Sequence, residues 1–180
     1  INFSTNKIFC ETNKEVHTAK LIVGSDGMNS KIRELSKISY RSWSYNQTAV
    51  VTNFKTSINE SCIKQTFTSI GPLALLPIND RESTMIWSID DDVSYKFLSM
   101  SDEEFTNEVV NKFGEQIGKL EMISKRQHFP LHHLSAKTFA KKGVFLVGDS
   151  AHHIHPLAGL GLNSGIGDVA CLSELIAVSY

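Results

Sequence analysis

The chain has 180 residues, of which 41% are hydrophobic and 21% are charged. This composition is typical of a globular chain that buries a core, and it argues against intrinsic disorder and fibrous repeats. The 18 basic and 19 acidic residues give a net charge of −1, without the basic cluster that a nucleic-acid partner would need. The three cysteines have no C-x-x-C spacing, which argues against a zinc finger and fits a reducing compartment. No apolar stretch reaches the length of a membrane span.

Both ends of the sequence have the features of cut points. Ile1 opens a strand-like segment without a Met or a signal sequence, and Tyr180 ends an apolar helical pattern without a stop signal. We therefore expect the sequence to be part of a longer polypeptide.

The first part of the chain, residues 1–39, predicts strands followed by a short helix. The continuous apolar run Leu21–Val23 is typical of a strand covered on both faces, and it leads directly into Gly24-Ser25-Asp26-Gly27. Asn29 or Ser30 can cap the helix that follows, because a short side-chain oxygen can accept the free N–H groups of the first turn. The predicted buried side of this helix consists of Ile32 and Leu35.

The middle of the chain predicts an antiparallel sheet and one helix. Strand-like segments recur at a regular spacing between Tyr40 and Ser99, as in an antiparallel sheet. These segments are Thr48–Thr56, Ile63–Ile70, Leu73–Ile78, Thr84–Ile89 and Ser94–Leu98. The segment Ser101-Asp102-Glu103-Glu104 then matches a capping box, and apolar residues at helical spacing follow it, so we expect a helix over about 102–117.

The last part of the chain repeats the pattern of the first part. Gly143–Asp149 predicts a buried strand that delivers a Gly and an Asp at its carboxyl end, and a glycine-bearing loop and a helix follow. The sheet region therefore reads as an insertion between two pieces of one α/β domain, which gives a fold of mixed α/β and α+β character. The predicted boundaries are 1–39, 40–135 and 136–180.

The segment after this last strand has the composition of a cofactor site. Asp149 suits a polyol hydroxyl, Gly159 and Gly161 let the backbone approach a planar ring, and the helix N-terminus offers positive potential. The Gly-x-Gly pair alone is a weak signal, because it lacks the third-glycine spacing of the dinucleotide-binding fingerprint. On the residue types alone, Asp149 is also compatible with a helix cap, and Asp26 with a turn residue.

Two motifs carry a resemblance to a known family. Residues 148–168 resemble the second flavin-binding motif of the class A flavoprotein aromatic monooxygenases, and Gly24–Arg33 resembles their Asp-Gly motif. Three further segments resemble the ubiquinone-biosynthesis hydroxylases of that superfamily: Gly71-Pro72-Leu73-Ala74-Leu75-Leu76-Pro77, Phe129-Pro130-Leu131 and His155-Pro156-Leu157-Ala158-Gly159. The resemblance covers nearly the whole chain. It implies part of an FAD-binding, Rossmann-like domain with an inserted, mainly antiparallel β-sheet substrate domain.

The resemblance also implies an activity and a cofactor site. The activity is hydroxylation of the aromatic ring of a polyprenylated phenol in ubiquinone biosynthesis, with FAD as cofactor, NAD(P)H as co-substrate and O2. A flavin hydroperoxide carries the chemistry in this family, so no catalytic side chain and no metal are predicted. The implied cofactor-binding residues are Asp26, Gly27, Arg33, Gly148, Asp149, Pro156, Gly159, Leu160, Gly161, Leu162 and Asn163. Among them, Asp149 would bind the ribityl chain, the backbone of residues 159–163 would face the flavin pyrimidine end, and Pro156 would shape the face of the flavin.

The implied partners are the polyprenyl phenol substrate and other proteins of ubiquinone biosynthesis. A hydrophobic substrate predicts peripheral membrane contact, in the cytoplasm or on the mitochondrial matrix side in a eukaryote. Phe67, Trp87 and Phe97 are candidates for a lipid-tail or phenol pocket, although aromatic residues on a sheet are more typical of core.

The sequence departs from the family pattern in a few places. Ser25 and Ser150 stand where the family usually has Ala, and Leu160 stands where it usually has Gln. The amino-terminal Gly-x-Gly-x-x-Gly unit is not found in these 180 residues, so we expect the isolated fragment to be inactive. Two alternatives stay open: a class A hydroxylase of a small soluble phenol, and a non-catalytic, truncated interaction module.

Overall fold

The computed structural model describes residues 1–3, 8–12, 15–58 and 61–179, and the chain divides into two compact units. Unit 1 consists of residues 1–45 and 132–180, and unit 2 consists of residues 46–131. Strands β5 (Tyr40–Thr56) and β10 (Gln127–Ala136) each run from one unit into the other. The chain thus leaves unit 1 once, forms unit 2 and returns.

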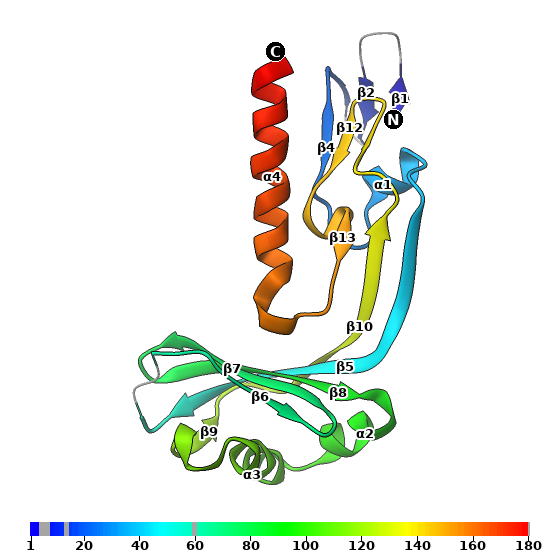
Figure 1. Cartoon of the computed structure of the whole chain (residues 1–180). Helices are drawn as coiled ribbons and strands as arrows, with labels where there is room; N and C mark the ends of the chain where they lie inside the picture. Colours follow the sequence, from blue (N-terminus) through cyan, green and yellow to red (C-terminus); the bar gives the residue numbers. More distant parts are fainter. Residues whose placement is uncertain (4–7, 13–14, 59–60, 180) are drawn as a thin grey trace. The chain divides into compact units, whose positions relative to one another are not determined.

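Unit 1 contains two small sheets (Figure 1). The first sheet is antiparallel and consists of β1 (Asn2–Phe3), β2 (Ile8–Glu11) and β3 (Val16–Ala19). In the second sheet β12 (Val144–Leu146) lies parallel to β4 (Ile22–Gly24) and antiparallel to β11 (Ala140–Lys141). Because the carboxyl ends of parallel strands meet at one edge of a sheet, β4 and β12 bring the two predicted motifs together.

The strand β4 differs from its prediction in burial. Val23 is 41% exposed, and Leu21 and Ile22 are half-buried, so the expectation of a strand covered on both faces is wrong for the described chain. The reason is position in the sheet, since β4 is an edge strand of a three-stranded sheet rather than a central parallel strand.

Helix α1 (Lys31–Leu35) follows the first motif. Ser30 is its N-cap and accepts the N–H of Arg33, which confirms Ser30 as the cap. The predicted buried side is wrong in part, because Leu35 is 52% exposed and Ile32 is half-buried. Arg33, 5% exposed, is the residue that this short helix buries, since its guanidinium finds backbone carbonyls as partners inside unit 1.

The second motif of unit 1 runs through short elements into a long helix. The 3-10 helix η2 (Gly148–Ser150) precedes β13 (His152–His153), which pairs with β10 through Leu134↔His153 and Ser135↔His152. The 3-10 helix η3 (Leu157–Gly159) then leads into α4 (Leu160–Ser179), which lies beside β12 (Figure 1).

Helix α4 is more apolar than the sequence analysis suggested. Residues Leu160–Val178 have a mean hydropathy of 1.2 and are long enough to cross a membrane, so the expectation that no segment reaches that length is wrong. The uninterrupted apolar runs are short, but only two residues of this helix, Asp168 and Glu174, are charged. Length and composition alone do not distinguish a span from a helix of a globular unit, and Asp168 in the middle of α4 is bonded to Gly148 and His152 of unit 1.

Unit 2 is an antiparallel sheet with helices on one side (Figure 1). Its strands pair in the order β10, β5, β8 (Glu82–Asp90), β7 (Gly71–Asn79) and β6 (Lys64–Thr68), and β9 (Leu120–Met122) also pairs with β5. The remaining elements are α2 (Asp91–Ser99), α3 (Asp102–Phe113) and the 3-10 helix η1 (Gly114–Ile117). The predicted antiparallel sheet is confirmed, and the helix predicted over 102–117 is confirmed as α3 followed by η1.

The strand predicted over Ser94–Leu98 is wrong, because this segment lies in α2. Asp90 is the N-cap, and Asp91 and Asp92 in the first turn complement the positive end of the helix dipole. Phe97 is the buried residue of α2 and packs edge-on against Trp87, with ring centres 5.0 Å apart. Acidic residues after a strand therefore start a helix here, although the apolar pattern is too sparse to predict one.

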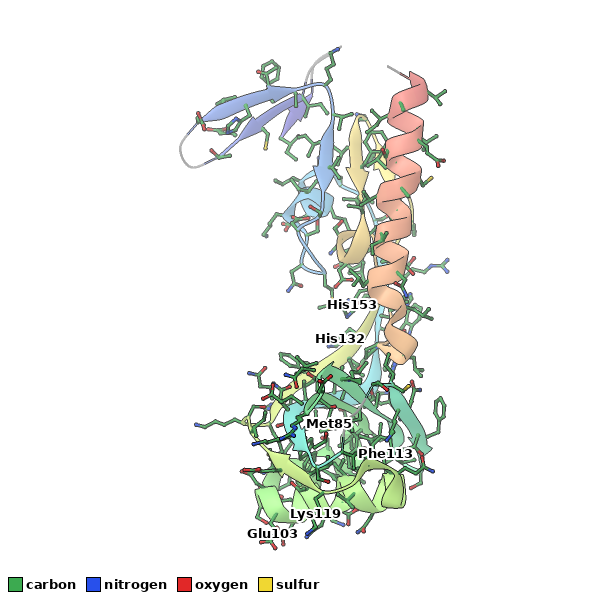
Figure 2. The ribbon with its side chains drawn as sticks, turned by 90° about the vertical axis from the view of Figure 1, so that its left-hand side faces the viewer. Met85, Glu103, Phe113, Lys119, His132 and His153 are labelled. Atoms are coloured by element: carbon green, nitrogen blue, oxygen red, sulfur yellow. The ribbon has the colours of Figure 1, made fainter. Side chains whose placement is uncertain are left out.

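The core of unit 2 lies between the sheet and the helices. Figure 2 shows Met85 inside this unit and Glu103 at its outer edge. The core cluster consists of Val50, Phe54, Leu73, Leu75, Met85, Trp87, Ile89, Phe97, Phe105, Val109 and Ile117.

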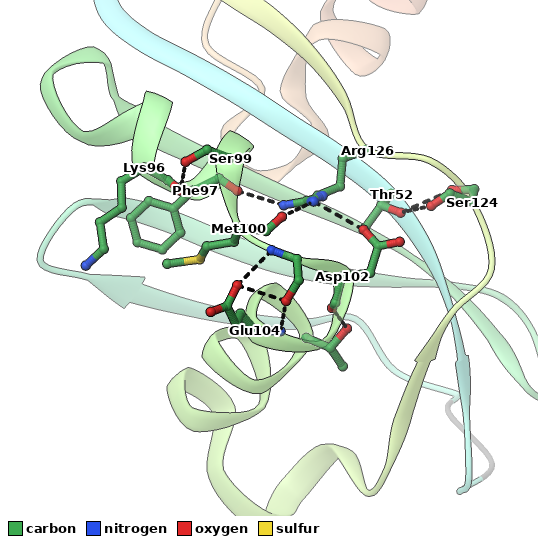
Figure 3. Close-up of polar contacts among 11 residues, drawn as sticks. Thr52, Lys96, Phe97, Ser99, Met100, Asp102, Glu104, Ser124 and Arg126 are labelled. Atoms are coloured by element: carbon green, nitrogen blue, oxygen red, sulfur yellow. Dashed lines mark hydrogen bonds and ion pairs between the residues drawn. The ribbon is translucent and has the colours of Figure 1, made fainter.

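Arg126 joins the end of α2 to the start of α3 (Figure 3). Its guanidinium donates to the carbonyl of Phe97 at 2.8 Å and to the carbonyl of Met100, and lies 3.2 Å from the carboxylate of Asp102. The same group sits 4.9 Å from the ring centre of Phe105. One side chain thus satisfies carbonyls at the connection between the two helices.

The opposite face of the unit 2 sheet carries partly exposed apolar side chains. Val51 pairs with Ile86, and Ile86 pairs with Ala74, all three half-buried. Phe67, on the same face of β6, is 73% exposed. By contrast, the candidates Trp87 and Phe97 belong to the core on the helix side.

Candidate cofactor site

The two motif segments of unit 1 are bonded to each other directly. The N–H of Val147 donates to the carbonyl of Gly24 at 3.0 Å, and the hydroxyl of Ser150 lies 2.6 Å from the same carbonyl. Ser150 is fully buried, so the hydroxyl that replaces the usual Ala methyl has found partners. The strand ends that carry the two motifs are therefore joined by hydrogen bonds as well as by strand pairing.

Arg33 forms a second connection between the motifs. Its guanidinium donates to the carbonyl of Ser150 at 2.8 Å and to the carbonyl of Met28 at 2.7 Å. The group is stacked 4.6 Å from the ring centre of Tyr40, and its Nε is buried without a hydrogen-bond partner in the described chain. These contacts direct the charge inward, toward the backbone of both motifs.

Asp26 closes the first turn of α1. Its carboxylate accepts the hydroxyl of Ser30 at 2.5 Å and the N–H of Ile32 at 3.1 Å. Burial alone would raise the pKa of Asp26, but the bonds from Ser30 and Ile32 outweigh it and lower the pKa below the usual value of 3.8. The neighbouring Gly27 has a φ of +78°, and a Cβ added there would meet no atom within 4 Å. The turn thus carries the ionised carboxylate of Asp26, and the space beside Gly27 is not filled by other atoms of the chain.

The second turn presents a carboxylate to the outside of unit 1. Gly148 has a φ of +59°, and its N–H donates to Asp168 at 2.8 Å. Asp149 follows, with a side chain 49% exposed and 3.1 Å from Nδ1 of His153. The predicted residues Gly148 and Asp149 therefore differ in role: the N–H of Gly148 is already bonded, and the carboxylate of Asp149 is accessible.

The remaining predicted residues lie at the start of α4. Pro156 is the N-cap of η3, and Gly159 ends η3 with a φ of +64°. A Cβ added at Gly159 or Gly161 would meet no atom within 4 Å, so the backbone is open to close approach there. The other predicted residues of this turn are all exposed: Leu160, Leu162 and Asn163. The N–H of Leu160 already donates to the carbonyl of Leu157, and the start of α4 carries the positive end of the helix dipole.

Sequence reasoning missed Asp168. Its carboxylate lies 2.7 Å from Nε2 of His152, and both side chains are mostly buried, at 16% and 14% exposed. The sequence does contain a signal for Asp168, because it is one of only two charged residues in an apolar helical segment. Its partners Gly148 and His152 are known only from the fold.

Two further histidines, His133 and His155, contact aromatic rings. His133 stacks on Trp43 with ring centres 3.8 Å apart, and its Nδ1 lies 3.3 Å from the hydroxyl of Tyr45. The same hydroxyl accepts the N–H of His155 at 3.3 Å, and burial lowers the pKa of His155. The segment that leads into Pro156 is therefore held by Tyr45.

The residues of this edge fit the flavin end of FAD. An accessible carboxylate suits a chain of hydroxyl groups, and open glycines beside a helix N-terminus suit the acceptor atoms of a planar ring. Asp149, Gly159 and Gly161 supply these features within unit 1.

A parallel strand pair with two Gly-and-Asp turns at its carboxyl edge is compatible with a nucleotide- or flavin-binding unit. Residues 8–180 match the FAD binding domain family, and the chain belongs to this family.

Relatives of known name narrow this class. The ubiquinone hydroxylase UbiL of Rhodospirillum rubrum is 33% identical over 162 residues, which are 89% of this chain and 38% of UbiL. The mitochondrial ubiquinone biosynthesis monooxygenase COQ6 of Xenopus tropicalis is 32% identical in an alignment of 196 positions, gaps included, that covers 89% of this chain and 42% of COQ6. The chain thus spans about two fifths of the length of these curated relatives. They confirm the predicted resemblance to ubiquinone-biosynthesis hydroxylases.

The fold agrees with solved structures. The structure of p-nitrophenol 4-monooxygenase PnpA from Pseudomonas putida matches 91% of this chain and 42% of PnpA with a TM-score of 0.68, at 20% sequence identity. The predicted mixed α/β fold with a large antiparallel sheet is therefore confirmed.

Proposed function

We propose that the protein containing this chain is an FAD-dependent monooxygenase that hydroxylates the ring of a polyprenylated phenol in ubiquinone biosynthesis, with NAD(P)H and O2. Family membership and the names of UbiL and COQ6 support the reaction class. The observation that carries the proposal is the joined pair of motif turns, together with the accessible carboxylate of Asp149 and the open glycines Gly159 and Gly161 of the same unit.

In this proposal the residues of unit 1 hold the flavin end of FAD. Asp149 accepts hydrogen bonds from the ribityl hydroxyls, and the backbone of residues 159–163 contacts the pyrimidine end. The helix N-terminus stabilises negative charge there, because its N–H groups and dipole are fixed before the ligand arrives. Asp26, Gly27 and Pro156 shape the surroundings. FAD, when bound, supplies the redox chemistry with O2 that protein side chains lack.

The apolar face of the unit 2 sheet is the proposed contact for the prenyl tail. Val51, Ala74, Ile86 and Phe67 offer partly exposed apolar surface, and covering such surface stabilises binding by about 25 cal/mol per Å². A small soluble phenol would gain nothing from this face. Comparing turnover of prenylated and unprenylated phenols with the same ring therefore distinguishes the proposal from its alternative.

The proposal also covers the cellular location of the protein and its contact with a membrane. The mitochondrial relative COQ6 supports the matrix side in a eukaryote, and an apolar substrate favours peripheral membrane contact and association with other enzymes of ubiquinone biosynthesis.

The cofactor site is tested by titrating the protein with FAD and following flavin fluorescence. We expect saturable binding that Asp149→Ala weakens roughly tenfold or more, because a hydrogen bond to a charged group is lost. Asp80→Ala removes another exposed carboxylate, in unit 2, and should leave the affinity unchanged. Equal affinity of the wild type and Asp149→Ala would contradict the proposed role of this residue.

A further inference from the structure

Asp168 is a mostly buried carboxylate in the middle of an apolar helix. Its side chain is 16% exposed, and one oxygen, Oδ2, lies 2.8 Å from the N of Gly148 and 2.7 Å from Nε2 of His152. His152 is itself only 14% exposed. Removing a carboxylate from water is costly unless it is paired and hydrogen-bonded, so both partners are needed to keep it there.

The main-chain partner of Asp168 is the peptide that starts the second flavin-motif turn. Gly148 has a φ of +59°, a conformation that favours glycine, and Asp149 is the next residue. The Asp168 carboxylate accepts the N–H of Gly148 and therefore fixes the direction in which the turn leaves β12. Asp149, whose side chain is 49% exposed, is presented by that turn.

Helix α4 also approaches this turn closely. A Cβ added at Gly165 would lie 3.3 Å from the Cα of Gly148, which is tighter than ordinary contact. Gly165 and Asp168 are three positions apart and so share one face of the helix. The absence of a side chain at Gly165 lets α4 come near enough for Asp168 to reach the N–H of Gly148.

We propose that Asp168 and His152 are positioning residues of the cofactor site. The Asp168 carboxylate holds the Gly148 peptide so that Asp149 faces a polyol ligand, and His152 holds Asp168 in place. Naming the ribityl chain of FAD as that ligand rests on the proposed function. The N–H of Gly148 is bonded to Asp168 and does not contact the ligand in this proposal. The ligand contacts of this motif are then made by Asp149 and the start of α4.

The first test needs no cofactor. Amide hydrogen exchange at Gly148 and Asp149 is measured in the wild type and in Asp168→Ala, Asp168→Asn and His152→Gln. We expect exchange at Gly148 to speed up at least about tenfold in Asp168→Ala, because the N–H loses its acceptor. Asp168→Asn keeps an acceptor oxygen and should restore part of the protection. Glu174→Ala, an exposed acidic residue of the same helix, is the matched control and should leave Gly148 unchanged.

The second test is a double-mutant cycle with FAD. Asp168→Ala should weaken FAD binding roughly tenfold, and it should cost little more when Asp149 is already Ala, because it acts through that residue. A general structural role would give the same loss in both backgrounds and would overturn the inference, as would unchanged exchange at Gly148. If the wild type binds no FAD, the cofactor proposal fails, whereas the exchange data still decide whether Asp168 holds the turn.

Discussion

The two units of this chain are stabilised in different ways. The core of unit 2 is a cluster of large apolar side chains that includes Trp87, Phe105 and Met85. In unit 1 the described apolar cluster is small and consists of Ile38, Ala136, Leu146 and Ala151, with Ile32 against it. Unit 1 also buries Arg33, the one charged residue among the buried side chains of the described chain. The unit with the candidate cofactor site therefore depends more on polar contacts.

This difference follows from what each unit has to do. Apolar burial is non-directional and stabilises a sheet against helices without fixing single backbone atoms. Hydrogen bonds are directional, and the bonds of Arg33, Ser150 and Asp168 each end on a backbone atom of a motif turn. A cofactor site needs backbone groups at fixed places, so directional bonds are the suitable means.

The largest effect is expected from the core of unit 2. Trp87→Ala should lower the free energy of unfolding by about 3–5 kcal/mol, because a fully buried ring leaves a cavity between Phe97 and Phe105. Tyr95→Ala, at a side chain 81% exposed, should change it by less than about 0.5 kcal/mol. Urea unfolding followed by circular dichroism measures both. Similar losses in the two variants would contradict the apolar account of unit 2.

An intermediate effect is expected from the polar contacts of unit 1. Arg33→Met should lower the free energy of unfolding by about 2–3 kcal/mol, because the buried carbonyl of Ser150 and the part-buried carbonyl of Met28 lose their donors. Arg41→Met, at an exposed arginine of the same unit, is the matched control. If the two variants unfold at the same urea concentration, Arg33 does not stabilise unit 1 in the way proposed.

The smallest effect is expected at the surface of unit 2. Ser101→Ala should lower the free energy of unfolding by about 1 kcal/mol, because the N–H of Glu104 loses the Ser101 hydroxyl as its acceptor in the capping box of α3.

The capping box also makes stability depend on pH. The backbone N–H of Ser101, and then its hydroxyl, donate to the Glu104 carboxylate and lower the pKa of Glu104 below its usual 4.5. A lowered folded-state pKa means that the contribution is present above the usual pKa and is lost as the pH falls through the lowered value. The stability difference between the wild type and Glu104→Gln should therefore narrow in acid. Glu103→Gln should show no such narrowing, and a parallel pH profile for the two variants would contradict this account.

Much of unit 2 and both motif segments could be predicted from sequence. Alternating apolar residues predicted the antiparallel sheet, and Ser101 with Glu104 predicted the start of α3, because these signals act between neighbours along the chain. The strand predicted over Ser94–Leu98 failed because Asp91 and Asp92 in the first turn favour a helix there, and the local apolar pattern is weak. The roles of the eleven predicted cofactor residues stay a prediction.

Sequence by itself determined the family, the two motif turns and the elements with strong local patterns. Tertiary structure decided that Arg33 turns inward, that Asp168 holds Gly148, and that Trp87 faces the core while Phe67 stays exposed. The physical reason is separation along the chain. Arg33 and Ser150 are 117 positions apart, so their contact exists only once β4 and β12 have paired, and no local preference in the sequence encodes it.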